Sequence, residues 1–231
     1  LQYLKKENLD HFKKLSDIYI LSKYWLEMQS KGLYIDGDFC FLKTHSALLS
    51  VFNNPLTNKE NSLGFFYIVR DPRDIAISYA KHLNIDYDTS IKRMIDSKTA
   101  FKYTNLEIFN DKNIVPIGIS SSWSVHLKSW RMFEVPNLLL KYEDIINEKK
   151  EVLKKIILFF SDNFNIKFNN LDEKINNILL NTSFENMKEL EKKSGFKEAI
   201  GGSKFFRKGK KGQWKNQLNL NQIKMIENSF E

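Results

Sequence analysis

Cysteine is nearly absent from this chain of 231 residues, in which Cys40 is the only one. A single cysteine cannot form an internal disulfide or a cysteine-rich metal site, and it is typical of a reducing compartment. We therefore expect a cytoplasmic protein in which Cys40 is an inert core residue. No apolar run approaches the roughly 18 residues of a membrane span. The longest candidate, residues 156–160, is a short core stretch, so we expect no membrane helix.

A strong charge of one sign is also missing. The chain has 36 Lys and Arg against 28 Asp and Glu, a net charge of +8. This mild excess suits an anionic partner without distinguishing a nucleotide from a nucleic acid or a lipid headgroup. With 42% hydrophobic residues, the chain can build one large α/β domain. No repeat or composition shift marks a second domain, so we expect residues 1–231 to form a single domain.

Short apolar runs and helical periodicity predict the elements of an α/β fold. The expected strands are residues 39–42, 65–69 and 137–142. The expected helices are residues 4–31, 72–82, 89–97, 121–133, a segment ending near 160, 171–180, 183–192 and 220–230. Apolar strands that alternate with helices indicate a central parallel sheet with helices on both faces, which is a three-layer arrangement. A basic loop is expected at residues 194–214.

One candidate anion site follows the second predicted strand, because ligands of parallel sheets bind beyond the carboxyl ends of the strands. Arg70 leaves the strand, Asp71 looks like a helix N-cap, and Ser78 lies about two helical turns later. The planar fork of Arg70 and the hydroxyl of Ser78 suit a phosphate monoester. The alternative is a capped surface helix in which Arg70 and Arg73 pair with Asp71 and Asp74.

A second candidate is the basic segment near the C-terminus. Arg207 and Lys208 bring positive charge, while Gly209 and Gly212 allow backbone N–H groups to approach an anion. A solvated loop and a nucleic-acid contact are the alternatives.

Histidine supplies the candidate catalytic group. His45 lies at the carboxyl end of the first predicted strand, and Lys43 precedes it by two positions. The unperturbed pKa of histidine, about 6.5, suits a general base at cellular pH. This position favours catalysis for His45 over a core histidine bonded to backbone. For His126, the helical spacing of Trp123 and Trp130 favours a packed helix face, with substrate contact as the alternative.

Several segments, in order along the chain, resemble those of sulfotransferases that use 3′-phosphoadenosine 5′-phosphosulfate (PAPS). Residues 66–79 resemble the 3′-phosphate-binding motif of this family. Residues 207–216 resemble its RKGxxGDWKN motif, with Gln213 in place of the usual Asp. Further segments resemble the KTH, SWxxHxxxW, YED and TSFxxMK motifs at residues 42–45, 122–130, 140–144 and 182–188. The resemblance covers most of the chain, and its strength lies in the ordered set.

The resemblance implies a fold like that of the P-loop nucleotide-binding proteins and a role for each matching residue. The implied cofactor residues are Arg70, Ser78, Tyr142, Thr182, Ser183, Phe184, Arg207, Lys208 and Gly209. Arg70, Ser78 and residues 207–209 would bind the 3′-phosphate, and the other four would surround the adenine. His45 is implied as the general base and Lys43 as a cation near the transferring sulfonate. No metal is implied.

The implied reaction transfers sulfonate from PAPS to the hydroxyl or amine of a small-molecule or carbohydrate acceptor. In-line transfer depends mostly on positioning and fixed cations, as in phosphoryl transfer. Residues 48–64 and 84–119 match no motif and are expected to line the acceptor pocket. No nucleic acid is expected as a partner.

The sequence departs from the family at its start. Family members bind the 5′-phosphosulfate with an N-terminal strand, a Lys-Ser-Gly-Thr-Thr-like loop and a helix, and no such loop precedes Leu42. The chain also begins at Leu1 and ends inside a helical pattern at Glu231. These features favour a fragment that lacks the first strand and the 5′-phosphosulfate loop over an inactive nucleotide-binding relic.

Two other functional classes compete with this interpretation. A basic module binding nucleic acid through residues 203–215 would show salt-steep affinity. A nucleotide kinase would need a GxxxxGK[ST] loop, which the chain lacks.

Overall fold

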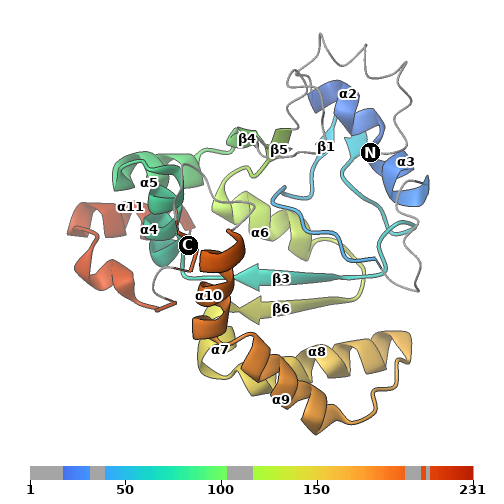
Figure 1. Ribbon diagram of the computed structural model, residues 1–231. Helices are drawn as coiled ribbons and strands as arrows, with labels where there is room; N and C mark the ends of the chain where they lie inside the picture. The colour runs from blue at the N-terminus through green and yellow to red at the C-terminus, as the bar shows by residue number, and fades with distance from the viewer. Residues whose placement is uncertain (1–17, 32–39, 103–116, 196–203, 207–208, 231) are drawn as a thin grey trace. The chain divides into compact units, whose positions relative to one another are not determined.

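The structure is a computed structural model, shown in Figure 1, and it describes residues 18–31, 40–102, 117–195, 204–206 and 209–230. The chain divides into two compact units. The first unit comprises residues 1–63, 93–135 and 230, and the second comprises residues 64–92, 136–229 and 231. The expected single domain stays a prediction.

The second unit contains two parallel strands, β3 (Phe65–Val69) and β6 (Asn137–Lys141), paired along their whole length (Figure 1). Helix α8 (Lys149–Phe164) packs against them, with the Phe66 and Phe159 ring centroids 5.1 Å apart. Both strands are apolar, but their burial is incomplete: Leu140 is 6% exposed, whereas Ile68 and Leu139 are 60% and 46% exposed. The α/β class with a parallel sheet is confirmed, and so are two of the three predicted strands.

The helix that follows β3 carries the first candidate anion site. Helix α4 (Pro72–Leu83) begins where the Asp71 carboxylate accepts a hydrogen bond from the Arg73 backbone N–H at 2.9 Å. It ends at Asn84, whose φ of 54° is in the left-handed region that asparagine tolerates. Ala76, Ile77 and Ala80 form the buried face of the helix and are each at most 1% exposed. The predicted helix at residues 72–82 is confirmed.

The remaining α-helices of the second unit agree with the expected segments, whereas a short 3-10 helix begins where a basic loop, residues 194–214, was expected to end. These elements are α5 (Tyr87–Ile95), which continues into the first unit, α7 (Tyr142–Asn147), α9 (Leu171–Asn181), α10 (Phe184–Ser194), the 3-10 helix η1 (Gln213–Asn216) and α11 (Leu220–Phe230). Helix α5 begins two residues before the predicted start. None of the helices in the described residues is both long and apolar enough to cross a membrane.

The first unit has shorter elements. They are α2 (Ile18–Lys23), α3 (Trp25–Lys31), β1 (Ser50–Val51), β2 (Asn54–Pro55), β4 (Ala100–Lys102), β5 (Ile117–Ile119) and α6 (Trp123–Arg131). Strands β1 and β2 pair antiparallel, as do β4 and β5. The predicted opening helix is confirmed only for α2 and α3, since residues 4–17 lie outside the described part of the chain.

One predicted strand is wrong. Residues 40–42 form no strand, and the side chains of Phe41 and Leu42 are 71% and 57% exposed. Cys40 is exposed as well, so it is not a core residue. An apolar run becomes a strand only where a neighbouring strand accepts its backbone hydrogen bonds. No described strand pairs with this segment.

Candidate functional site

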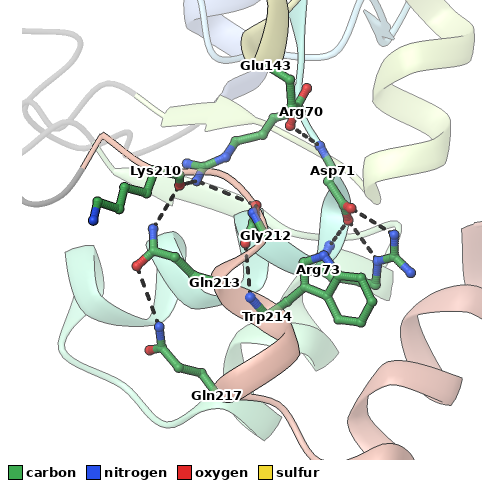
Figure 2. A network of polar contacts seen from close by, with 10 residues as sticks. Arg70, Asp71, Arg73, Glu143, Lys210, Gly212, Gln213, Trp214 and Gln217 are labelled. Carbon is green, nitrogen blue, oxygen red and sulfur yellow. Dashed lines mark hydrogen bonds and ion pairs between the residues drawn. The ribbon is translucent and has the colours of Figure 1, made fainter. Parts of the chain in front are cut away.

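Arg70 connects three segments that the sequence separates widely. Its Nη2 donates a hydrogen bond to the Lys210 carbonyl at 3.3 Å. Its guanidinium carbon lies 4.3 Å from the centre of the Tyr142 ring. Figure 2 shows Arg70 extending from the end of β3 towards Lys210. The structure therefore brings the first candidate segment together with the C-terminal basic segment and with Tyr142.

The guanidinium of Arg70 is poorly paired for a buried cation. Its side chain is 16% exposed, and the Asp74 carboxylate with which it pairs is 4.0 Å away. Within the described residues, the buried Nε of Arg70 has no hydrogen-bond partner. A buried cation needs hydrogen-bonding anions to offset its lost hydration. Arg70 is therefore suited to accept an anionic ligand.

Arg73 differs, because it is fully engaged by protein groups. Its side chain donates to both carboxylate oxygens of Asp71, at 3.0 and 2.8 Å, and to Glu227 at 2.7 Å. Its guanidinium carbon also lies 3.8 Å from the centre of the Trp214 ring. Burial would raise the pKa of Asp71, but the bonds from Arg73 outweigh it and lower that pKa. The capped-helix alternative thus holds for Arg73 and Asp71.

Asp74 is a residue of this site that sequence reasoning missed. Its side chain is 2% exposed. Oδ2 accepts the Gly212 backbone N–H at 2.6 Å, and Oδ1 accepts the Trp214 backbone N–H at 3.1 Å. A carboxylate on the apolar face of a predicted helix, one turn before Ile77, is the signal that could have found it, because such a group needs buried donors.

A second group of predicted cofactor residues meets at the start of α10. Gly209 has a φ of 57°, and a Cβ at this position would lie 2.7 Å from two ring atoms of Phe184. The ring of Phe206 lies 6.2 Å from that of Phe184, edge to face. Gly209 therefore serves two purposes: it adopts a left-handed backbone and it lets the chain pass against the Phe184 ring.

The hydroxyls next to Phe184 bond to the local backbone. Ser183 is the N-cap of α10 and accepts the Asn186 backbone N–H at 3.2 Å. The hydroxyl of Thr182 donates to the Ile178 carbonyl at 2.6 Å. The Thr182 carbonyl in turn accepts a hydrogen bond from Lys149, whose pKa is lowered by burial. These bonds fix the backbone that presents Phe184.

Three further residues, Ser78, Arg207 and Lys208, were predicted to bind the 3′-phosphate. Ser78 lies exposed on α4, and its hydroxyl makes no hydrogen bond to another described residue. Arg207 and Lys208 lie outside the described residues.

Gln213, which replaces the family's usual Asp, joins a chain of amide contacts. Its Nε2 donates to the Lys210 carbonyl at 2.9 Å, and its Oε1 accepts from Gln217 at 3.5 Å (Figure 2). The Oε1 of Gln217 accepts from Lys81 at 2.8 Å and from the Tyr87 hydroxyl at 2.9 Å. A carboxylate at position 213 could not donate to the Lys210 carbonyl, so this contact depends on the substitution.

The predicted catalytic residues belong to the first unit. Lys43 and His45 are exposed. The segment that carries them is attached to α6, because Trp130 Nε1 donates to the Ser46 carbonyl at 3.0 Å and Ser129 Oγ accepts the Leu48 N–H at 3.0 Å. These bonds link the KTH segment to the SWxxHxxxW helix.

His126 also lies beside His45. Burial lowers the pKa of His126, the charge of His45 lowers it further, and a hydrogen bond to the His45 backbone raises it. Trp130 is 8% exposed, which agrees with a packed helix face. Sequence reasoning did not associate the two histidines, since nothing in their spacing of 81 residues indicates a contact.

The predicted catalytic residues lie in the first unit and the described cofactor residues lie in the second, and the roles expected for them stay predictions. In the described residues, no group of three or more His, Cys, Asp or Glu side chains is placed to hold a metal ion.

Comparison with known proteins gives a consistent result. A family profile described as "Sulfotransferase domain" matches residues 36–231. Sulfotransferase 1B1 of Canis lupus familiaris is 30% identical over 188 residues, which is 78% of this chain and 57% of the dog protein. Sulfotransferase 1B1 of Mus musculus is 28% identical over 214 residues, which is 87% of this chain and 66% of the mouse protein. The chain thus spans roughly three fifths of these relatives.

The fold of this chain is similar to that of a solved structure. The crystal structure of retinol dehydratase in a complex with retinol and PAP superposes with a TM-score of 0.56 at 21% identity, covering 97% of this chain and 64% of that one. At this identity the likeness concerns the fold.

Proposed function

The chain belongs to the sulfotransferase family, and we propose that it is part of an enzyme that transfers sulfonate from PAPS to a hydroxyl or amine acceptor. The observation that carries this proposal is the poorly paired guanidinium of Arg70, which lies against Lys210 and Tyr142. A 3′-phosphate would add anionic acceptors to a guanidinium whose partners in the described residues are a carbonyl, an aromatic ring and a carboxylate 4.0 Å away.

In the proposed site, the nucleotide has two contact regions in the second unit. Arg70, Ser78 and residues 207–209 bind the 3′-phosphate. Phe184 packs on the adenine, with Tyr142, Thr182 and Ser183 nearby. The contact of Gly209 with Phe184 supports a shared site, because it joins the segment proposed for the phosphate to the residue proposed for the base.

In the first unit, His45 is the proposed general base. It would accept the proton of the acceptor as the new sulfur–oxygen bond forms, while the bond between sulfur and the 5′-phosphate oxygen breaks and adenosine 3′,5′-bisphosphate leaves. Lys43 would stabilise negative charge near the sulfonate. The exposure of both side chains, on a backbone held by Trp130 and Ser129, supports this assignment.

The acceptor is proposed to be a small molecule or a carbohydrate. The relative crystallised with retinol and PAP supports a small apolar alcohol. A cytoplasmic location is likewise a proposal.

Calorimetry with adenosine 3′,5′-bisphosphate tests the phosphate site. Wild type should bind it more tightly than adenosine 5′-monophosphate, and Arg70→Ala should weaken binding of the bisphosphate by roughly 10- to 100-fold, the value of a charge-assisted hydrogen bond. Arg131→Ala removes an exposed arginine of α6 and should change nothing. If wild type does not bind the bisphosphate, or Arg70→Ala binds it equally well, the proposed site is wrong.

Transfer of labelled sulfonate from PAPS, measured with the full-length protein, tests the chemistry. His45→Ala should lower kcat by roughly 10²- to 10⁴-fold, the usual contribution of a general base. The KM for PAPS should stay unchanged. A His45→Ala enzyme with the wild-type kcat would remove His45 from the mechanism.

A further inference from the structure

We propose that Asp74 is a positioning residue that gives the nucleotide site its preference for a 3′-phosphate. This inference rests on the proposed function. Asp74 does not contact the nucleotide in this proposal. It holds the Gly212–Trp214 backbone against the start of α4, and that backbone sets the position of Lys210 and Arg70.

The contacts of Asp74 are those of a buried double acceptor. Its side chain is 2% exposed, and each carboxylate oxygen accepts one backbone N–H, from Gly212 at 2.6 Å and from Trp214 at 3.1 Å. A carboxylate accepts at both oxygens, whereas an amide of the same shape has one acceptor and one donor group. An asparagine in either orientation would therefore turn its NH₂ towards one of the two N–H groups.

The link from Asp74 to Arg70 has two parts. Directly, Asp74 Oδ2 lies 4.0 Å from Arg70 Nη2, which places a negative charge beside the buried guanidinium. Indirectly, the Gly212 N–H held by Asp74 lies two residues after the Lys210 carbonyl, to which Arg70 donates at 3.3 Å. Figure 2 shows Lys210, Gly212 and Trp214 along one side of the network and Arg70 reaching it from the other. If Asp74 loses its donors, the acceptor that orients Arg70 moves.

A second carboxylate provides a matched comparison. Glu191 of α10 accepts the backbone N–H groups of Phe205 and Phe206, at 2.5 and 3.0 Å. It too holds the backbone of the C-terminal segment through two N–H groups, but within the described residues no hydrogen bond or ion pair joins it to Arg70. It acts near Phe206, whose ring lies against Phe184 on the adenine side. Comparing variants of Asp74 and Glu191 therefore distinguishes a specific effect on 3′-phosphate binding from a general loosening of the C-terminal segment.

The experiment measures the ratio of dissociation constants for adenosine 5′-monophosphate and adenosine 3′,5′-bisphosphate by calorimetry. Asp74→Asn should reduce this ratio by roughly tenfold or more, the scale of a lost hydrogen bond to a charged group. Affinity for the monophosphate should change little. Glu191→Gln should weaken both nucleotides alike and leave the ratio unchanged. Circular dichroism establishes that each variant is folded.

Gly212→Ala perturbs the donor of the hydrogen bond between the Gly212 N–H and Asp74. It tests the inference even if Asp74→Asn does not fold. The added Cβ meets no atom within 4 Å, but the φ of 71° is strained for alanine, so the N–H that Asp74 accepts should move. This variant should also lower the ratio. A wild-type ratio retained by the folded Asp74→Asn and by Gly212→Ala overturns the inference, as does an equal fall in Glu191→Gln. A wild type without any preference for the bisphosphate, by contrast, overturns the proposed function itself.

Discussion

At the scale of single residues, Arg70 and Asp74 are both held by backbone groups: Arg70 donates to the Lys210 carbonyl, and Asp74 accepts the N–H groups of Gly212 and Trp214. Arg70, Phe184 and Gly209 were expected in one site, and Arg70 and Gly209 each lie in contact with a predicted partner segment. The role of Asp74 was missed because its donors are backbone N–H groups. Every residue except proline has a backbone N–H group, so the identities of residues 212 and 214 do not indicate the hydrogen bonds to Asp74.

His126 gives a prediction at the same scale. Burial, and then the charge of His45, hold the pKa of His126 below the ordinary value of about 6.5. In His45→Ala the charge is lost, while burial and the hydrogen bond to the backbone of residue 45 remain. The pKa of His126 should therefore rise in this variant but stay below 6.5. NMR titration of the imidazole protons measures it.

The sign of the effect on stability follows from the same shift. The unfolded chain binds a proton at position 126 more readily than the folded chain does, so stability should fall as the pH drops below about 6.5. His126→Gln should reduce that loss in urea unfolding at pH 5.5 compared with pH 7.5. A His126 pKa at or above 6.5 in the wild type would contradict the buried environment.

At the scale of elements, the long helices could be predicted from the sequence and the short strands could not. Helices α4, α9, α10 and α11 were predicted to within two residues because their apolar periodicity extends over several turns. Strands β1, β2, β4 and β5 have two or three residues each and were not predicted. Such short strands depend on their partner and not on their own composition. The same dependence explains why the apolar residues 40–42 form no strand.

The segment around Gly209 allows a prediction at this scale. Gly209→Ala would add a Cβ 2.7 Å from the Phe184 ring and would strain a backbone with a φ of 57°. The ring must move, so affinity for adenosine 5′-monophosphate should fall together with affinity for the bisphosphate. The left-handed strain should also cost about 1–2 kcal/mol of unfolding free energy. Calorimetry and urea unfolding measure the two effects.

Gly195→Ala is the matched control. Gly195 also has a positive φ, 70°, but a Cβ there meets no atom within 4 Å. The Gly195→Ala variant should be less stable than the wild type but should bind the nucleotides with unchanged affinity. If Gly209→Ala binds both nucleotides as tightly as Gly195→Ala does, the Phe184 ring is not part of the adenine site.

At the scale of the whole molecule, the division into two units separates the proposed chemistry into a nucleotide part and a catalytic part. Arg70, Tyr142, Phe184 and Gly209 belong to the second unit, and His45 belongs to the first. The division itself was not predicted, because both units are assembled from segments far apart in the sequence, and no shift in composition marks their boundaries.

This division leads to a prediction for amide hydrogen exchange. A ligand that binds only the folded state of one unit raises the free energy of opening that unit, by about 2.7 kcal/mol at a ligand concentration 100 times the dissociation constant. Adenosine 3′,5′-bisphosphate should therefore slow exchange in peptides from residues 64–92 and 136–195, while peptides from residues 40–63 and 117–135 should exchange as before. In Arg70→Ala at the same ligand concentration, the protection should shrink in proportion to the lost affinity. Equal protection in both units would mean that the bisphosphate is held by the first unit as well, and the assignment of the nucleotide site to the second unit alone would be wrong.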